Sequence, residues 1–174
     1  MEFSKITFQK VEIPRYIEEK IQLCALNHLE LEDMGKLRDK FDAQAYYDKL
    51  RIEILSEYAF EKFLDFNEFD WQSRMKKENK RLQYELEGKK IVLCPFTKDR
   101  KPKYVNETPA NTILIYLKPE RKVYIRGLLT FKTIENILKN SKEKNTSILG
   151  TVLEIEEKQI ISFSSKAQLV DFIQ

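Results

Sequence analysis

The sequence has little of several residue types, and each shortage excludes a class of protein. Only 4 of its 174 residues are Gly and 5 are Pro, which excludes collagen-like and linker-dominated chains. No apolar run approaches the roughly 20 residues of a membrane span, and the first ten residues lack the apolar stretch of a signal peptide. We therefore expect a cytoplasmic protein with no membrane partner.

The residues of metal and nucleophile chemistry are also scarce. His28 is the only histidine, which excludes zinc enzymes with several His ligands. Because it ends an apolar helical stripe and has no partners in the sequence, we predict a packed or capping residue rather than a ligand. Cys24 and Cys94 are too few for a disulfide framework and are interpreted as reduced thiols. Cys94 lies on an apolar strand and is followed by Pro95, which favours a small buried hydrophobe over a nucleophile.

What the chain does contain is enough for one folded domain with an uneven charge distribution. Hydrophobic residues make up 42% of it and aromatic residues 11%, so a core can form. The formal net charge is only +3. Residues 1–73 carry 10 basic and 16 acidic side chains, whereas residues 74–103 carry 11 basic and 4 acidic ones. The weak overall charge therefore hides a strongly basic middle.

Hydrophobic periodicity predicts an alternation of helices and strands. Gly88 is predicted to supply the tight turn of a hairpin over residues 81–96. Asp42, Thr130 or Thr133, and Ser164 or Ser165 are predicted helix caps. The expected elements are a strand over 5–13, helices over 14–31 and 43–64, the hairpin, strands over 111–118 and 121–130, a helix over 131–139, strands over 148–156 and 158–164, and a closing helix. This order indicates a mixed α+β (α/β) domain.

The layout resembles that of the PD-(D/E)XK nuclease-like superfamily, which includes restriction endonucleases and Holliday-junction resolvases. The resemblance lies in LSEYAFEKFL (55–64), LQYELEGKKIVLCPF (82–96), ILIYLKPERKVYIRGLLTFKTI (113–134) and KQIISFSSKAQLVDFI (158–173). It implies a restriction-endonuclease-like core over residues 43–174, in which helices flank a central mixed sheet. Residues 1–42 would then be an added N-terminal strand and helix.

The resemblance also implies where an active site would lie, and the residues there differ from the family pattern. In the register set by Gly88, Gln83 replaces the first acid, Val92 the second acid and Cys94 the lysine. Val92 and Cys94 offer no oxygen ligand to a hard cation, and a lone amide such as Gln83 is a poor Mg²⁺ ligand. Only Glu57 matches, as the accessory glutamate. The resemblance therefore implies a catalytically inactive relative without a cofactor.

Two other interpretations stay open. Glu57, Asp70 and Glu85 could form a relocated acidic site, which would make the chain a Mg²⁺-dependent DNA nuclease. The same acids can equally be a solvated helix stripe and the polar edge of a hairpin. The chain can also be a non-catalytic subunit that binds a protein partner.

The basic middle is the predicted binding surface. Its segments RMKKENKR (74–81) and KDRKPK (98–103) flank the hairpin, and Tyr84, Phe96 and Tyr104 are interleaved with them. Such a pattern suits phosphate contacts and base stacking, although a solvated lysine-rich loop would look the same. We expect nucleic acid, DNA rather than RNA, or a protein partner, and leave a homodimer open. The predicted contact residues are Arg74, Lys76, Lys77, Lys80, Arg81, Lys98, Arg100, Lys101 and Lys103.

Overall fold

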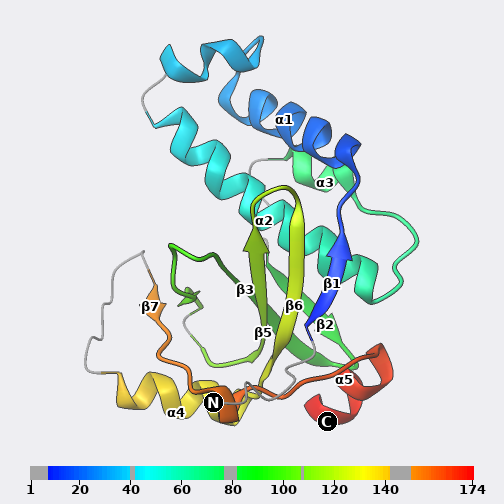
Figure 1. Ribbon diagram of the computed structural model, residues 1–174, viewed down its shortest axis with the longest axis vertical. Helices are drawn as coiled ribbons and strands as arrows, with labels where there is room; N and C mark the ends of the chain where they lie inside the picture. The colour runs from blue at the N-terminus through cyan, green and yellow to red at the C-terminus, as the bar shows by residue number, and fades with distance from the viewer. Residues whose placement is uncertain (1–7, 40–41, 77–81, 107, 142–149) are drawn as a thin grey trace.

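A five-stranded mixed sheet lies between two layers of helices in the computed structural model (Figure 1). The structure describes residues 8–39, 42–76, 82–106, 108–141 and 150–174. The elements are β1 (Gln9–Glu12), α1 (Arg15–Leu29), the 3₁₀ helix η1 (Met34–Asp39), α2 (Ala43–Phe63), α3 (Trp71–Met75), β2 (Gln83–Leu86), β3 (Lys89–Phe96), β4 (Lys103–Tyr104), β5 (Asn111–Lys118), β6 (Lys122–Leu129), α4 (Phe131–Asn140), β7 (Thr151–Val152), the 3₁₀ helix η2 (Glu157–Gln159) and α5 (Lys166–Ile173). The predicted class, a mixed α+β domain whose sheet is flanked by helices, is confirmed.

The strand order in the sheet is β1-β6-β5-β3-β2. The pair β3 and β5 is parallel, and every other neighbouring pair is antiparallel. The predicted hairpin is present as β2 and β3, joined at Glu87 and Gly88. Both turn residues have positive φ, 49° and 71°, as a tight hairpin turn requires. The separate pair β4 and β7 forms a small second sheet.

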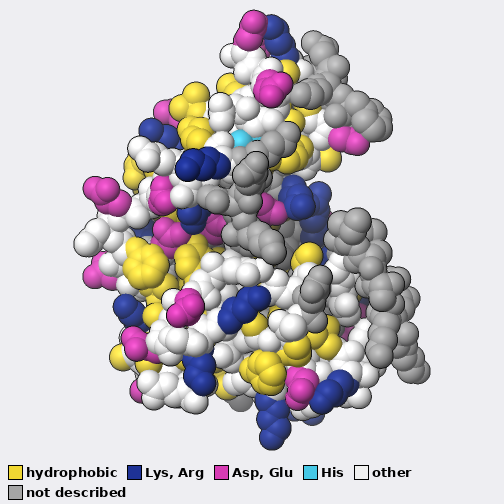
Figure 2. Space-filling model, turned by 180° about the vertical axis from the view of Figure 1, so that it is seen from behind, with side chains coloured by type: hydrophobic (Ala, Val, Ile, Leu, Met, Phe, Trp, Pro, Cys, Tyr) yellow, Lys and Arg dark blue, Asp and Glu magenta, His cyan; other side chains and the backbone are white. Residues whose placement is uncertain are grey.

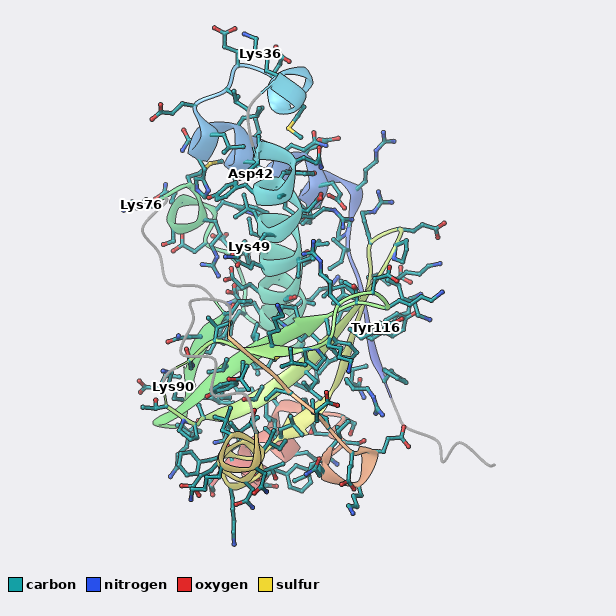
Figure 3. All side chains as sticks on the ribbon, turned by 90° about the vertical axis from the view of Figure 1, so that its left-hand side faces the viewer. Lys36, Asp42, Lys49, Lys76, Lys90 and Tyr116 are labelled. Atoms are coloured by element: carbon teal, nitrogen blue, oxygen red, sulfur yellow. The ribbon has the colours of Figure 1, made fainter. Side chains whose placement is uncertain are left out.

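The two faces of the five-stranded sheet are covered by different helices. Strand residues such as Ile91 and Leu93 face α2 and belong to the main core with Phe60 and Ile54. The alternate residue Val92 faces the other way, into a second cluster with Ile134 of α4. Figure 3 shows α2 above the sheet and α4 below it. Side chains that alternate along one strand therefore meet different layers.

The N-terminal strand and helix belong to the same core. β1 pairs with β6 at the edge of the sheet, and the predicted stripe of α1 is buried at Ile17, Ile21, Cys24 and His28. Ile17 and Ile21 pack into the main core with α2. None of the described helices is long and apolar enough to cross a membrane.

The two strands predicted near the C-terminus are mostly wrong. Among the described residues of these two segments, Thr151–Val152 is the one strand, and residues 157–159 form η2. Ile161 makes a single bridge to Leu128. The reason is that β1 already occupies the edge of β6 as far as Ile125, so only the end of β6 is left for pairing. A Cβ on Gly127 would lie 2.8 Å from the carbonyl oxygen of Ile161, so only glycine allows this close approach.

Local signals at the helix ends have mixed outcomes. Thr130 caps α4 and Ser165 caps α5 through side-chain oxygens that accept backbone N–H groups, as predicted. The predicted cap of α2 at Asp42 is wrong, because this residue adopts a left-handed conformation and its side chain accepts no capping hydrogen bond. The helix α3 was not predicted, since five residues are too few to show a helical period.

Candidate nucleic-acid interface

Gln83, Val92 and Cys94 meet on the sheet face that α4 covers. Gln83 is the register partner of Val92, and Val92 and Cys94 are buried in one cluster beneath α4. Gln83 is exposed, and its Nε2 donates to Oδ1 of Asn106 at 2.7 Å. This face of the hairpin presents an amide, a branched aliphatic group and a thiol.

The Cys94 thiol is built into the core rather than exposed to a substrate. Its Sγ donates to the carbonyl oxygen of Lys103 at 3.2 Å. Burial raises the pKa of the Cys94 thiol to about 12, so the thiolate that a nucleophile needs does not form near neutral pH. The prediction of a small buried hydrophobe is confirmed.

Glu57 lies on the opposite side of the sheet from these three residues. It projects from α2, and its Oε1 accepts the backbone N–H of Leu82 at 3.0 Å. Its Oε2 accepts from Nε of Arg74 at 2.6 Å. The resemblance implied one site made by Glu57 together with Gln83, Val92 and Cys94, but the alternation along β3 separates them.

Glu57 instead belongs to a buried ion-pair cluster formed by Glu57, Glu61, Arg74 and Tyr84. Arg74 Nη2 donates to Oε1 of Glu61 at 2.7 Å, and the Tyr84 hydroxyl donates to the same oxygen at 2.7 Å. Burial raises the pKa of the Glu61 carboxyl, although Tyr84 and Arg74 partly oppose the shift. Burial and the two carboxylates raise the pKa of the Tyr84 hydroxyl. The cluster fixes α3 and the start of β2 against α2.

His28 fixes the same region from α1. Its Nε2 lies 2.8 Å and 3.1 Å from the carbonyl oxygens of Arg74 and Met75. Carbonyls only accept, so Nε2 carries the proton, and in the neutral ring Nδ1 accepts from the Tyr46 hydroxyl at 2.9 Å. The single histidine shows only a small trace of colour in the space-filling view (Figure 2), as its 4% exposed area requires. The packed role predicted for His28 is confirmed.

The relocated acidic site does not assemble. Asp70 is exposed and caps α3, accepting from the Ser73 N–H at 3.0 Å. Glu85 is exposed on the face of β2 opposite to Tyr84, which contacts the cluster around Glu57. Within the described ranges, no group of three or more His, Cys, Asp or Glu side chains is arranged to hold a metal ion.

The predicted basic surface divides into two parts. Arg74 is not on it, because its side chain is only 14% exposed and pairs with Glu57 and Glu61. Lys76 is exposed at the end of α3, well away from the end of β5 marked by Tyr116 in Figure 3. Three other predicted residues lie outside the described residues: Lys77, Lys80 and Arg81.

The second part is an exposed basic turn, defined as residues 97–103. Backbone hydrogen bonds between Thr97 and Arg100, at 3.1 and 3.4 Å, close it. Lys101 is also bonded to Glu154 at 3.3 Å, with both side chains largely exposed. All four predicted cations of this segment are exposed: Lys98, Arg100, Lys101 and Lys103.

Beside the basic turn lies a feature that the sequence reasoning missed, an aromatic row formed by Phe96, Tyr116 and Tyr124. These residues are register partners on β3, β5 and β6. The Phe96 and Tyr116 rings stack with centroids 5.1 Å apart, and the Tyr116 and Tyr124 centroids lie 6.4 Å apart. The alternation of Ile115, Tyr116 and Leu117 in the sequence was the available indication of this row, since it places Tyr116 on the sheet face away from α2.

The other two aromatics of the basic middle are not available to a ligand. The Tyr84 hydroxyl donates a hydrogen bond to Oε1 of Glu61, within the buried ion-pair cluster. Tyr104 is buried, and its hydroxyl donates to the carbonyl oxygen of Thr108 at 2.7 Å. Of these three aromatics, Phe96 is half-buried and lies directly before the basic turn.

Comparison with known proteins finds no matching family model, no matching curated protein and no matching solved structure.

Proposed function

We propose that this chain binds nucleic acid through the basic turn and does not cleave it. One observation carries the proposal. Lys98 and Arg100 lie where the chain is closed by the hydrogen bonds between Thr97 and Arg100, and Lys103 begins β4 three residues later. Within the described part of the chain, none of these three cations forms an ion pair with an acid. Asp99 is the single acid of the turn. Cations held close together without acidic partners suit the phosphates of a nucleic-acid backbone.

The restriction-endonuclease-like core is part of the same proposal. Its support is the sequence resemblance, together with the order α2, β2, β3, β5, β6, α4 along the chain. In such a core the hairpin β2–β3 would face the nucleic acid, and the basic turn directly follows β3. The mixed sheet flanked by helices is compatible with this core.

Absence of cleavage follows from the chemistry of the hairpin residues. Hydrolysis of a phosphodiester with a divalent ion requires oxygen ligands that converge on it. Val92 and Cys94 supply none, and Gln83 is bonded to Asn106. Glu57 is on the far side of the sheet and is neutralised by Arg74. Groups that act together lose nearly all rate enhancement when one is missing.

The test is equilibrium binding of a labelled oligonucleotide as a function of salt. Each phosphate contact contributes about 0.7–0.9 to the slope of log affinity against log salt. The triple variant Lys98→Gln, Arg100→Gln, Lys103→Gln should therefore weaken binding and reduce the slope by about 2. Incubation of the protein with Mg²⁺ or Mn²⁺ and linear, nicked or branched DNA should leave the DNA intact.

A matched control separates local contacts from a change in net charge. Lys20, Lys36 and Lys49 are exposed on the helical half of the molecule, and Figure 3 shows Lys36 and Lys49 far from Tyr116. Their replacement by Gln changes the net charge equally and should leave the slope unchanged. Equal effects of the two triple variants would refute the proposal. No binding by the wild-type protein at about 50 mM salt would refute it too, and would favour the protein-interaction alternative.

A further inference from the structure

We propose that the nucleic acid bound by this chain is single-stranded, and that its bases stack on the aromatic row of Phe96, Tyr116 and Tyr124. The inference rests on the proposed function and specifies its ligand. Stacking on the rings can be tested separately from the phosphate contacts in the basic turn, because stacking uses ring faces rather than charge.

The aromatic row lies on the sheet face away from α2, and its three rings are half-buried. In Figure 1 the upper ends of β5 and β6 lie in front of α2, so the viewer faces the surface that carries the row, and α4 and β7 lie toward the other end. Phe96 touches the cluster beneath α4 at its edge. Tyr116 and Tyr124 belong to none of the hydrophobic clusters and are only half-buried. Among the described residues, neither of these two hydroxyls has a hydrogen-bond partner.

The rings of the row stack on one another, and the proposal is that unpaired bases extend this stack. The rings stand on three neighbouring strands at centroid separations of 5.1 Å and 6.4 Å, with interplanar angles of 29° and 35°. Phe8 extends the row beyond Tyr124 as an edge contact at 6.0 Å and is 44% exposed. A sheet surface with two or three such rings is a known way to hold unpaired bases.

Cations lie beside the row at the carboxyl ends of the parallel strands β3 and β5. Lys118 lies two residues after Tyr116 on the same face, and its Nζ is 5.8 Å from the Tyr116 centroid and 5.3 Å from the Tyr124 centroid. No ion pair of Lys118 occurs in the described part of the chain. The basic turn begins at the residue after Phe96, and because β3 and β5 are parallel, the turn and Lys118 both follow the row at the carboxyl ends of these strands. A nucleic-acid strand that crosses the rings thus meets cations for its phosphates along this side of the row.

A duplex cannot use this surface in the same way. Its bases are stacked on one another inside the helix, so their faces do not reach the rings. A duplex would bind only through phosphates and the basic turn. A preference for single strands is therefore the property that distinguishes stacking from charge alone.

The test compares two variants that differ only in the aromatic ring. The first, Tyr116→Leu with Tyr124→Leu, keeps an apolar surface and removes the stacking faces. The second, Tyr116→Phe with Tyr124→Phe, keeps both rings and removes the hydroxyls. Phe172→Leu on α5, which alters an exposed ring (45%) away from the row, is the control. The probes are a fluorescein-labelled oligothymidylate of about 12 nucleotides and a hairpin duplex of equal length.

The wild-type protein should bind the single strand at least about tenfold more tightly than the duplex. The Leu variant should lose at least about tenfold in affinity for the single strand, with an unchanged salt slope. The Phe variant and the Phe172→Leu control should stay within about twofold of wild type.

The inference is overturned if the Leu variant binds the single strand as well as wild type does, or if the duplex binds equally well. In that case the proposed function survives as long as the Lys98, Arg100, Lys103 variant still weakens binding. If wild type binds neither probe, the proposed function fails and the inference fails with it.

A second measurement on the wild-type protein avoids any folding defect of the variants. Nitration of tyrosine by tetranitromethane, followed by mass spectrometry, reports which rings are accessible. Saturating oligothymidylate should protect Tyr116 and Tyr124 and leave the exposed Tyr16 on α1 reactive. Unchanged nitration of Tyr116 and Tyr124 would overturn the stacking inference.

Discussion

Replacement of Arg74 by Met is the strongest predicted perturbation of the fold. The guanidinium bridges Glu57 and Glu61 at 2.6 and 2.7 Å, and its Cζ lies 4.5 Å from the centroid of the Phe69 ring. The side chains of Arg74, Glu57 and Glu61 are 14%, 1% and 11% exposed. Methionine keeps much of the apolar contact with Phe69 and leaves two buried carboxylates without their cation. Removal of one partner from a buried pair costs about 3–5 kcal/mol.

For a chain of this length that loss lowers the melting temperature by about 10 °C. Thermal unfolding followed by circular dichroism is the assay. Lys101→Met is the matched control, because it breaks an ion pair with Glu154 in which the side chains are 70% and 81% exposed. Exposed pairs contribute about 0–1 kcal/mol, so the control should melt within about 3 °C of wild type. Equal losses in the two variants would show that the buried Arg74 cluster stabilises the fold no more than an exposed ion pair does.

The remaining predictions concern pH, one glycine and the thiols. Burial raises the pKa of Glu61 above 4.5, so the folded state binds the proton of this carboxyl more tightly than the unfolded state does. The free energy of unfolding of wild type relative to Glu61→Gln should therefore increase as the pH falls from 7 toward 4.5 and then level off. Urea unfolding measures this difference, and a difference that does not change with pH would contradict the prediction. Gly127→Ala should lower the free energy of unfolding by about 2 kcal/mol or more, since its Cβ would meet the Ile161 backbone. Gly88→Ala, which has open space around it, should lower it by only about 1 kcal/mol. Equal urea midpoints for the two variants would contradict this prediction. Cys94, which is buried with a pKa of about 12, should not react with a thiol reagent until the protein unfolds, and rapid labelling of the folded protein at this residue would contradict its burial.

Local and alternating patterns in the sequence were sufficient for much of the sheet. The hairpin turn at Gly88, the strands at 111–118 and 121–130, and the caps at Thr130 and Ser165 each depend on residues within a few positions of one another. These signals reflect backbone conformation and hydrogen bonding that neighbours decide. They were therefore readable without knowledge of the tertiary fold.

The arrangement of the candidate site depends on contacts between residues that lie far apart in the sequence. Alternation showed that Val92 and Cys94 share a face, but not that α2 would cover the other one, and so it gave no reason to separate Glu57 from them. The local excess of basic residues suggested that Arg74 is a surface charge, but its side chain is only 14% exposed and pairs with two glutamates of α2. The row of Phe96, Tyr116 and Tyr124 needs the cross-strand register of three strands, which no single segment of sequence contains.

An amide NMR titration of the wild-type protein with oligothymidylate locates the binding surface residue by residue. If the basic turn and the aromatic row hold the strand, the largest shift changes should fall at residues 97–103 and at the ends of β3, β5 and β6 that carry Phe96, Tyr116 and Tyr124. The amide signals of Lys36 and Lys49 should stay unchanged. Changes concentrated around α1 and α3, or no change at saturating oligonucleotide, would show that this surface does not bind nucleic acid.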